Sequence, residues 1–583
     1  MPAPRRSSTV SFHAPVRLRR LHPQTSAYQN LDTLLNELYR SRGAAARERC
    51  ELDALLPASA LHGITAAADL LATAIEQRQR LLVIGDYDAD GATGSALALL
   101  VLRAFGAAEV DHLIPSRFTN GYGLSPALID IAATRQPDLI ITVDNGIANV
   151  EAIDHAHKLK IPVLITDHHL PGAELPAAAA IVNPNQPDCD FPSKCLAGVG
   201  VMFYLLAATR ASLRQRGWFA HHPEVNLADY LDLVALGTVA DVVTLDANNR
   251  ILVEQGLRRI RAGRCRPGLR ALLDIAGRRL EQLTARDLAF VAAPRLNAAG
   301  RLEDMSLGVE CLVTADPVQA MQLARQLDTL NSQRRVLEAD IRQAAQAVVE
   351  RLNQQLTQLP PGLCLYDAGW HSGIIGIVAA RLRERYQRPV IVFAPAGTQD
   401  VITGSARSIE QLHIRDLIER IASAVPGLIL RFGGHAMAAG LTIKRDDFDQ
   451  FRAAFDTMVE QELGVAEPVR ELVSDGELGS ELLTLSCAEC LRTVAPWGKG
   501  FPEPLFDGIF EVSGAHVVGN RHLKLHARPP GGVPLEAIGF GLAEQRAAIT
   551  PDMQLVYRLD VNDYRGLRRP QLILEHLQST PST

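Results

Sequence analysis

Acidic and imidazole side chains gather at three places in the first third of the chain, and one further acid follows an apolar segment later on. The members are Asp86, Asp88, Asp90, Asp144, Asp167, His168, His169 and Asp241. Carboxylate oxygens and imidazole nitrogens together suit Mn²⁺ or Mg²⁺, whereas thiolates would favour zinc. If these side chains meet in space, we expect them to bind two divalent cations.

A pair of such cations is suited to one kind of chemistry. Cations about 3.5–4 Å apart can hold a water or hydroxide between them and align it with a phosphorus atom. They lower the pKa of that water and neutralise charge on the phosphate oxygens. Converging carboxylates also need cations, because like charges raise each other's pKa. The cluster therefore predicts metal-dependent hydrolysis of phosphodiester bonds.

Each motif taken singly has a simpler explanation. An Asp-x-Asp sequence commonly forms a turn or a helix cap, and a pair of histidines commonly lies on the surface. The three clusters here differ because each one directly follows a short apolar run. Convergent titratable groups of this kind are typical of a functional site. We therefore favour metal binding.

The apolar runs predict the elements that position the cluster. Residues 80–85, 139–143 and 161–166 are apolar, and helical patterns follow at 92–105 and 150–159. Strands alternating with helices predict an α/β fold with a parallel sheet covered on both faces. Ligands of such sheets bind beyond the carboxyl ends of the strands, where these acids lie. The apolar segment 231–240 then leads to Asp241.

The rest of the chain changes character several times. After the first α/β block, a mainly helical region ends in one long helix that starts at Asp316. A second α/β block follows it. Strand-like segments separated by Gly, Pro and Asn turns then predict an all-β barrel of the oligonucleotide-binding type. The strands expected in the barrel are 506–513, 522–527, 536–540 and 554–561. The predicted domains are a disordered basic tail (1–30), a catalytic domain with an N-terminal helical segment (31–315), a connecting helix (316–358), a substrate-binding α/β domain (359–462) and the barrel (463–577).

The composition narrows the class of protein. The eight scattered cysteines among 583 residues form no disulfide framework, which fits a reducing cytoplasm. No apolar run approaches the roughly 20 residues that a membrane span needs. The net charge of −6 argues against a protein that coats nucleic acid indiscriminately.

Basic residues are nevertheless concentrated between residues 257 and 301, a stretch that we call the arginine strip. Its eleven arginines are Arg258, Arg259, Arg261, Arg264, Arg266, Arg270, Arg278, Arg279, Arg286, Arg295 and Arg301, against three acids. A local basic strip on an acidic protein suits a groove for a polyanion. A solvated helical face is the alternative.

Four motifs in combination resemble the DHH phosphoesterase family. They are Asp-Tyr-Asp-Ala-Asp-Gly (86–91), Asp-Asn-Gly (144–146), Asp-His-His (167–169) and Gly-Thr-Val-Ala-Asp (237–241). Within that family the chain is similar to single-strand-specific 5′→3′ DNA exonucleases over about residues 30–575. Further similar segments are 116–123, 294–301, 404–408, 433–435 and 497–506, and the second α/β block resembles the family's DHHA1 domain.

The resemblance implies a role for each site residue. The implied metal ligands are Asp88, Asp90, Asp144, His168 and Asp241, with Asp144 bridging the two ions and Asp86 as a further ligand or a neighbouring acceptor. The implied catalytic residues are His169, Asp144 and Asp167, and His169 would face the scissile phosphate. Ile84 stands where many members have a histidine, so Asp86 or water would complete that ion's coordination.

Substrate contacts are implied farther along the chain. The candidates are Arg117, Arg295, Asn297, Arg301, Ser405, Arg407, Gly433, Gly434 and His435. Bases of a single strand could stack on Trp497, Phe506, Phe510 or Phe540. Most strand aromatics belong to a core, so only one or two of these are expected to touch bases.

The implied activity is removal of 5′-mononucleotides from the 5′ end of single-stranded DNA in recombination and repair, including mismatch repair. The implied partners are a single-strand-binding protein and a helicase, and the protein would be a cytoplasmic monomer that binds no membrane. One alternative is a phosphodiesterase of the same fold acting on small substrates, but the long helix, the arginine strip and the barrel argue against it. The other is a non-catalytic nucleic-acid-binding scaffold, but every motif acid is present.

Overall fold

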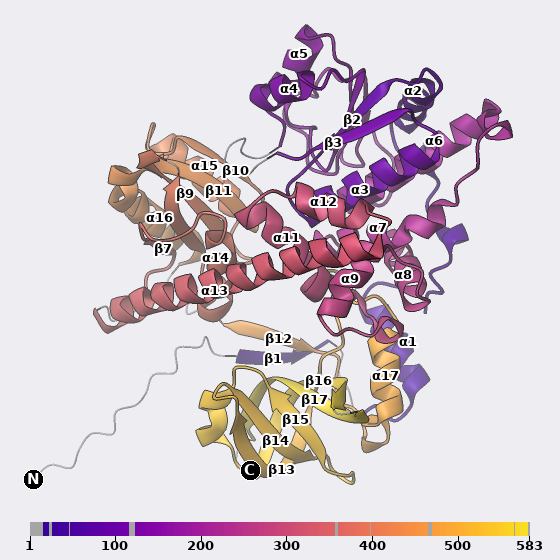
Figure 1. Cartoon of the computed structure of the whole chain (residues 1–583). Helices are drawn as coiled ribbons and strands as arrows, with labels where there is room; N and C mark the ends of the chain where they lie inside the picture. Colours follow the sequence, from indigo (N-terminus) through magenta and orange to yellow (C-terminus); the bar gives the residue numbers. More distant parts are fainter. Residues whose placement is uncertain are drawn as a thin grey trace, which may run out of the picture. The chain divides into compact units, whose positions relative to one another are not determined.

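The computed structural model describes residues 16–21, 26–45, 47–115, 123–355, 359–396, 398–464, 469–564 and 566–580. The chain divides into two compact units, one comprising residues 1–19 and 332–472, the other residues 20–331 and 473–583. Figure 1 labels their helices and strands. Arg117, a predicted substrate contact, lies outside the described residues.

A five-stranded parallel sheet organises the larger unit. Its strands are β2 (Arg80–Gly85), β3 (Glu109–Leu113), β4 (Leu139–Val143), β5 (Val163–Thr166) and β6 (Ala180–Val182), in the order β3-β2-β4-β5-β6. The three strands predicted from apolar runs are confirmed. The prediction missed the two edge strands, because β3 is half exposed with polar residues and β6 is only three residues long.

Helices cover both faces of this sheet. Alternate residues of β2 enter different cores, because successive side chains of a strand point to opposite faces. Leu81 and Val83 pack with α2 (Ile64–Glu76), α3 (Ala89–Ala104) and α6 (Gly198–Gln215). Leu82 and Ile84 pack with α4 (Pro126–Ala133) and α5 (Val150–Lys158). Ile84 is fully buried in this second core, which accounts for an apolar residue at that position.

A helical layer completes the catalytic half of this unit. It consists of α7 (Leu231–Ala240), α8 (Ala247–Arg261), α9 (Pro267–Ile275), α10 (Ala285–Asp287), α11 (Ala293–Leu302) and α12 (Ser306–Val313). The apolar segment that leads to Asp241 is the buried helix α7. The long connecting helix is confirmed as α13 (Pro317–Gln355), whose residues up to 331 belong to this unit and whose later residues belong to the other.

The smaller unit contains a mixed sheet of order β10-β11-β9-β8-β7. Its strands are β7 (Leu363–Tyr366), β8 (Val390–Ala396), β9 (Thr398–Arg407), β10 (Arg431–Gly434) and β11 (Ala438–Lys444), with helices α14 (Ile375–Tyr386), α15 (Ile414–Ala424) and α16 (Phe448–Leu463). Only β7 and β8 pair in parallel. The glycine-rich segment 433–440 forms most of the β10–β11 hairpin.

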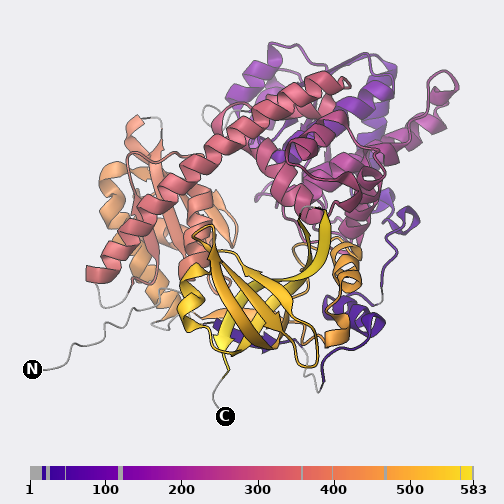
Figure 2. The ribbon, with the colours of Figure 1, turned by 60° about the horizontal axis from the view of Figure 1, so that its bottom comes forward.

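The C-terminal strands close into a barrel of order β13-β14-β15-β17-β16, as expected (Figure 2). They are β13 (Phe506–Val518), β14 (His522–Arg528), β15 (Leu535–Gly539), β16 (Asp552–Tyr564) and β17 (Leu567–Ser579), of which β17 was not predicted. Helices α1 (Leu31–Ser41) and α17 (Leu485–Thr493) share the barrel's core through residues such as Leu34, Leu38 and Leu491. The prediction that the N-terminal helical segment belongs wholly with the catalytic domain was therefore wrong for α1.

The prediction of a disordered tail over residues 1–30 was also wrong for its described part. Val16–Arg20 forms strand β1, which pairs with β12 (Arg470–Ser474). The guanidinium of Arg20 lies 2.8 Å from the carboxylate of Asp507, whose side chain is fully buried. Basic residues that suggested a solvated tail thus have acidic partners more than 400 residues away in the sequence.

Two further expectations can be compared with the structure. All eight cysteines are free thiols, as expected, and Cys487 and Cys490 lie on α17. Among the described residues, no single helix is both long and apolar enough to cross a membrane, and only one bent pair, Leu52–Ala60 with Ile64–Glu76, meets those criteria together.

Candidate metal centre

The turn after β4 holds Asp144 in a left-handed backbone conformation, with φ of +64°. The side-chain amide of Asn145 donates to the backbone carbonyls of Ile84 and Val143, and the hydroxyl of Thr142 donates to the backbone carbonyl of Asn145. Gly146 has φ of +116°, which a residue with a Cβ rarely adopts. The Asp-Asn-Gly sequence is therefore what this turn needs to direct Asp144 across the ends of the strands.

The loop after β2 presents its acids through helix ends. Asp88 caps α3 by accepting from the amides of Asp90 and Gly91 at 2.9 and 3.0 Å. Asp90 accepts from the amides of Gly198 and Val199, the first residues of α6, at 2.6 and 2.9 Å. Carboxylates are stabilised at helix N-termini, so two helices fix these side chains.

Asp167 organises the turn that follows β5. One of its oxygens accepts from the amides of His168 and His169 and lies 2.7 Å from Nδ1 of His169, while the other accepts from the amide of Ile147. Both oxygens are thus committed to the protein. The structure places Asp167 as a positioning residue for His169 and does not bring it into a group that could ligate a metal.

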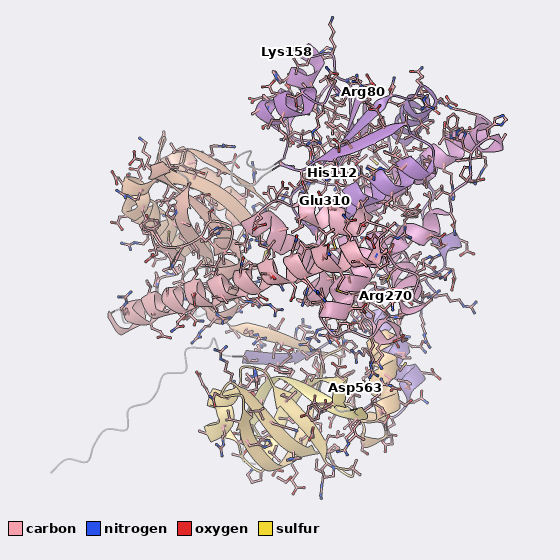
Figure 3. All side chains as sticks on the ribbon, in the orientation of Figure 1. Arg80, His112, Lys158, Arg270, Glu310 and Asp563 are labelled. Atoms are coloured by element: carbon pink, nitrogen blue, oxygen red, sulfur yellow. The ribbon has the colours of Figure 1, made fainter. Side chains whose placement is uncertain are left out.

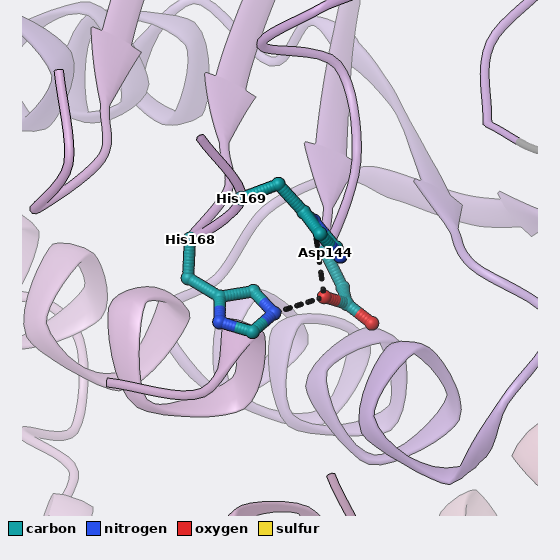
Figure 4. A group of neighbouring side chains, drawn as sticks. All are labelled: Asp144, His168 and His169. Atoms are coloured by element: carbon teal, nitrogen blue, oxygen red, sulfur yellow. Dashed lines mark ion pairs between the residues drawn. The ribbon is translucent and has the colours of Figure 1, made fainter. Parts of the chain in front are cut away.

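The imidazole of His168 lies between two acids that come from different elements. Its Nε2 lies 2.9 Å from Oδ1 of Asp144 and 3.5 Å from Oδ2 of Asp241, which follows α7. Nδ1 of His169 lies 3.9 Å from the same oxygen of Asp144. The dashed lines in Figure 4 join both imidazoles to Asp144.

Three overlapping groups could each hold a cation. They are Asp86 with Asp88 and Asp144, Asp90 with His168 and Asp241, and Asp144 with His168 and His169, the ligand atoms of each lying within 4.8 Å of one another. Asp144 and His168 each belong to two groups. The structure therefore brings together all six predicted metal ligands, at the carboxyl edge of the sheet.

The electrostatics of the cluster favour bound cations. Burial and the charge of Asp88 raise the pKa of Asp90 to about 7. Burial and the charges of Asp90 and Asp88 raise the pKa of Asp144 and of Asp241 well above the ordinary range. The carboxylates repel one another, and divalent cations would remove that repulsion.

The two adjacent histidines titrate in opposite directions. Burial and the neighbouring His169 lower the pKa of His168 to about 4, so it is neutral and can donate a lone pair to a metal. Burial would also lower the pKa of His169, but its hydrogen bond to Asp167 and the surrounding carboxylates raise that pKa to about 9. His169 is therefore a cation that can stabilise a phosphate or donate a proton.

The donor atoms fit divalent metal ions. Oδ1 of Asp144 and Nε2 of His168 are buried, yet neither has a hydrogen bond of acceptable geometry to any described residue despite their separation of 2.9 Å. Two buried donor atoms 2.9 Å apart are close enough to bind one cation beside them.

Comparisons with known proteins agree with this geometry. Three family models match: "DHH family, N-terminal domain" over residues 80–238, "DHHA1 domain" over 343–461 and "RecJ OB domain" over 474–576. The single-stranded-DNA-specific exonuclease RecJ of Dickeya dadantii is 51% identical over 96% of this chain and 98% of its own length. That of Escherichia coli is 49% identical over 94% and 96%.

This chain belongs to the RecJ family.

Solved RecJ structures have the same fold. The crystal structure of RecJ from Thermus thermophilus in complex with Mn²⁺ has a TM-score of 0.77 at 31% identity and covers 97% of this chain and 80% of that one. The Mg²⁺ complex from the same organism has a TM-score of 0.72 at 30% identity and covers 97% and 79%. The predicted architecture of DHH catalytic domain, DHHA1 domain and oligonucleotide-binding barrel is confirmed.

Two of the RecJ-like residues proposed for substrate are held by partners within the protein. Oδ1 of Asn297 accepts from the amide of Ala89 at 2.8 Å. Arg295 is buried and forms an ion pair with Asp328 at 2.8 Å. Both lie on α11, and Gly300 of the same helix meets the carbonyl of Tyr87 so closely that a Cβ would lie 1.9 Å from it. Arg301, at the end of α11, is partly buried.

The DHHA1 residues predicted to bind phosphate do come together. Ser405 pairs with Gly440 across β9 and β11, and Gly440 pairs with Gly433 across β11 and β10. Nη1 of Arg407 donates to Oγ of Ser405 at 3.1 Å. Gly434 ends β10, and the amide of His435 donates to the carbonyl of Ala438 in the hairpin turn.

Helix α14 also approaches Ser405 and Arg407, which was not predicted. A Cβ on Gly376 would lie 2.9 Å from Oγ of Ser405 and 3.0 Å from Nη2 of Arg407. The turn before α14 carries His371, whose Nδ1 accepts from the amide of Gly373. The Trp-His-Ser-Gly sequence at 370–373, just before an apolar helix, was the signal available.

Most of the aromatic candidates belong to cores. Trp497 stacks on Phe501 and donates from its indole nitrogen to the carbonyl of Leu491 at 2.6 Å. Phe506 and Phe510 are buried inside the barrel. Phe540 is 60% exposed, and it alone of the four remains available for stacking on a base.

The arginine strip is largely neutralised. Carboxylate partners within 4 Å are found for Arg258, Arg261, Arg266, Arg270, Arg278, Arg286 and Arg295. Arg259 donates to Gln255. Arg264 and Arg279 are exposed and have no side-chain partner among the described residues. The expected continuous groove for a polyanion is therefore not formed by the strip as a whole.

Proposed function

We propose that this protein is a single-stranded-DNA-specific exonuclease that uses two divalent cations, Mn²⁺ or Mg²⁺, to hydrolyse phosphodiester bonds from the 5′ end and release 5′-mononucleotides. The observation that carries the proposal is the meeting of Asp90, Asp144, His168 and Asp241 at one edge of the sheet with buried donor atoms left for cations. RecJ relatives that cover nearly the whole chain support the DNA substrate.

The residues divide the chemistry among them. Asp86, Asp88, Asp90, Asp144, His168 and Asp241 would hold the two ions, and Asp144 would be the carboxylate that the overlapping groups share. The bound ions would supply an activated water. His169, held by Asp167, would face the scissile phosphate as a charge stabiliser or as a proton donor to the leaving oxygen.

Other residues would hold the strand. Ser405 and Arg407, with the backbone of Gly433 and Gly434, would bind phosphate, and Arg407 carries the guanidinium that suits a phosphate monoester at a 5′ end. His435, Arg117 and Arg301 are proposed as further contacts. The barrel offers an exposed aromatic, Phe540, for a base.

We further propose a cytoplasmic monomer that acts in DNA recombination and repair, including mismatch repair, beside a helicase and a single-strand-binding protein. The free thiols support a reducing compartment. A single-strand-binding protein would present the substrate, and a helicase would generate it from duplex DNA.

Degradation of labelled oligonucleotides tests the proposal. Single strands of about 30 nucleotides, well beyond the site of one barrel, should release labelled mononucleotide at once from a 5′ label and only late from a 3′ label. Duplex DNA of the same sequence should resist. Cleavage should need Mn²⁺ or Mg²⁺ and stop with a chelator. Preference for a dinucleotide would favour a small-substrate phosphodiesterase, and no metal-dependent product would favour a scaffold.

A further inference from the structure

A cavity of about 390 Å³ lies in the larger unit, lined by residues that take no part in the metal centre. We call it the arginine pocket and define it by Arg278, Arg279, Arg492, Asp287 and Asp563. The first two arginines follow α9 of the catalytic domain, Arg492 lies on α17, and Asp563 lies at the end of β16. Figure 3 labels Asp563 on the barrel and Arg270 on α9. Catalytic domain and barrel thus build the pocket together.

The acids of the arginine pocket already have partners. Asp287 lies 3.3 Å from Nε of Arg278 and accepts from the amide and hydroxyl of Thr284 at 3.0 and 2.8 Å. Asp563 lies 3.9 Å from Nε of Arg568. Arg568 also pairs with Glu489 at 2.7 Å, so two acids share it. Asp287 is therefore matched within the protein, and Asp563 is matched in part.

Two guanidinium groups remain for an external anion. Neither Arg279 nor Arg492 forms an ion pair or side-chain hydrogen bond with any residue that the structure describes. Arg279 is exposed and Arg492 is partly buried, so an anion can reach both. Most members of the arginine strip have a protein partner. Within the described part of the chain Arg264 and Arg279 are the exceptions, and of these two Arg279 lines the arginine pocket.

The size of the pocket favours a nucleotide over a small inorganic ion. A cavity of about 390 Å³ falls in the range of roughly 300–1,000 Å³ that organic ligands occupy. Two guanidinium groups at one cavity match the charge and the hydrogen-bond acceptors of a nucleotide's phosphate.

We propose that the arginine pocket binds an internucleotide phosphate of the single-stranded substrate, on the part of the strand that has not yet reached the metal centre. This inference rests on the proposed function, which supplies the polyanion. The pocket would anchor long strands to the catalytic domain and the barrel at once. A strand too short to span the distance from the metal centre to the pocket would gain no affinity from the pocket.

The test measures binding of a 3′-labelled 30-nucleotide strand and a 6-nucleotide strand by fluorescence anisotropy, in an Asp144→Ala background that prevents cleavage. Arg279→Gln and Arg492→Gln should each weaken binding of the long strand about fivefold to tenfold. Each should also reduce the magnitude of the slope of log K (the observed association constant) against log [salt] by about 0.7, the value for one phosphate contact. The short strand should lose less affinity. Arg279→Lys should lie between Gln and wild type.

Arg264→Gln is the matched control, because Arg264 is an exposed arginine of the same strip without a partner among the described residues and does not line the pocket. It should stay within twofold of the background. If Arg264→Gln and Arg279→Gln weakened DNA binding equally, the proposed role of the pocket would be wrong. It would also be wrong if Arg279→Gln weakened binding of an aspartate-rich peptide but left binding of the DNA unchanged. Wild-type protein that degrades no single-stranded DNA would instead overturn the proposed function. Thermal unfolding of each variant checks its fold.

Discussion

The Cα of Gly198 faces the side chain of Asp144 so closely that a Cβ on this glycine would lie 2.6 Å from Cβ of Asp144. The first residue of α6 therefore sets the position of the acid that joins the proposed ion sites. A Gly198→Ala variant should push Asp144 aside and lower kcat on the order of 100-fold, the cost of a displacement of about 1 Å. Steady-state cleavage of a 5′-labelled single strand measures it.

The control for this variant lies one half-turn along the same helix. A Cβ on Gly200 would have as its nearest contact Cδ2 of Leu196 at 3.1 Å, the far end of a flexible side chain. Gly200→Ala should keep near-normal kcat, since alanine is the better helix former by about 1 kcal/mol. Equal losses in both variants would show that α6 itself, and not its contact with Asp144, limits activity.

Removal of the bridging carboxylate should separate catalysis from binding. Asp144→Ala should reduce cleavage below detection, because one side chain would serve both ions. Affinity for single-stranded DNA should stay within a few-fold, since the basic groups that bind phosphate lie elsewhere. Single-turnover cleavage and anisotropy check the two parts. Asp154→Ala, on the exposed face of α5, is the control. Wild-type cleavage by Asp144→Ala would refute the metal assignment.

His168 should be replaceable in part by metal concentration. His168→Ala removes one imidazole from the group with Asp90 and Asp241, so metal affinity should fall at least about tenfold while the other ligands remain. Excess Mn²⁺ should then restore part of the rate. The measurement is the rate as a function of [Mn²⁺], with His157→Ala on α5 as a surface control. A rate that is low at every Mn²⁺ concentration would mean that His168 acts beyond metal binding.

Asp167→Asn should act through its histidine neighbour. The pKa of His169 is raised to about 9 by the hydrogen bond and charge of Asp167 against the effect of burial, so loss of that charge should lower it toward or below 6.5. NMR titration of the imidazole carbons should show the shift, and kcat should fall about 10–100-fold with its basic limb moved to lower pH. Asp130→Asn is the matched control, because Asp130 pairs with the surface His155 at 2.7 Å. An unchanged pH profile in Asp167→Asn would contradict the positioning role.

Cation binding should release protons near neutral pH. Asp90 has a pKa of about 7 in the metal-free site, raised by burial and by Asp88, so a cation must displace its proton at lower pH. A raised carboxyl pKa also means that the metal-free fold loses stability as the pH rises from about 4 to about 7. Mn²⁺ affinity should therefore increase from pH 6 to pH 8, and added Mn²⁺ should raise Tm more at pH 8. Calorimetry in buffers of different ionisation enthalpy counts the protons, and equal counts at both pH values would exclude this linkage.

The sequence alone determined which acids and imidazoles meet in one cluster and where in the fold they lie. The acids of the first three motifs each follow an apolar run, and parallel strands bring their carboxyl ends to one edge of a sheet. β2 and β4 were predicted with their observed bounds, because both are buried on two faces and read as continuous apolar runs. Half-exposed strands such as β3 lack that signal.

The tertiary structure decided which polar residues are already committed to the protein. Asp167, Asn297 and Arg295 carry motif-like chemistry in the sequence, yet each is held by partners that the fold supplies. The arginine strip shows the same limit, since sequence cannot say that Arg278 meets Asp287 while Arg279 has no partner among the residues described. Hydrogen bonds and ion pairs act over only a few ångströms, so their choice of partner depends on distances that exist only after the chain has folded.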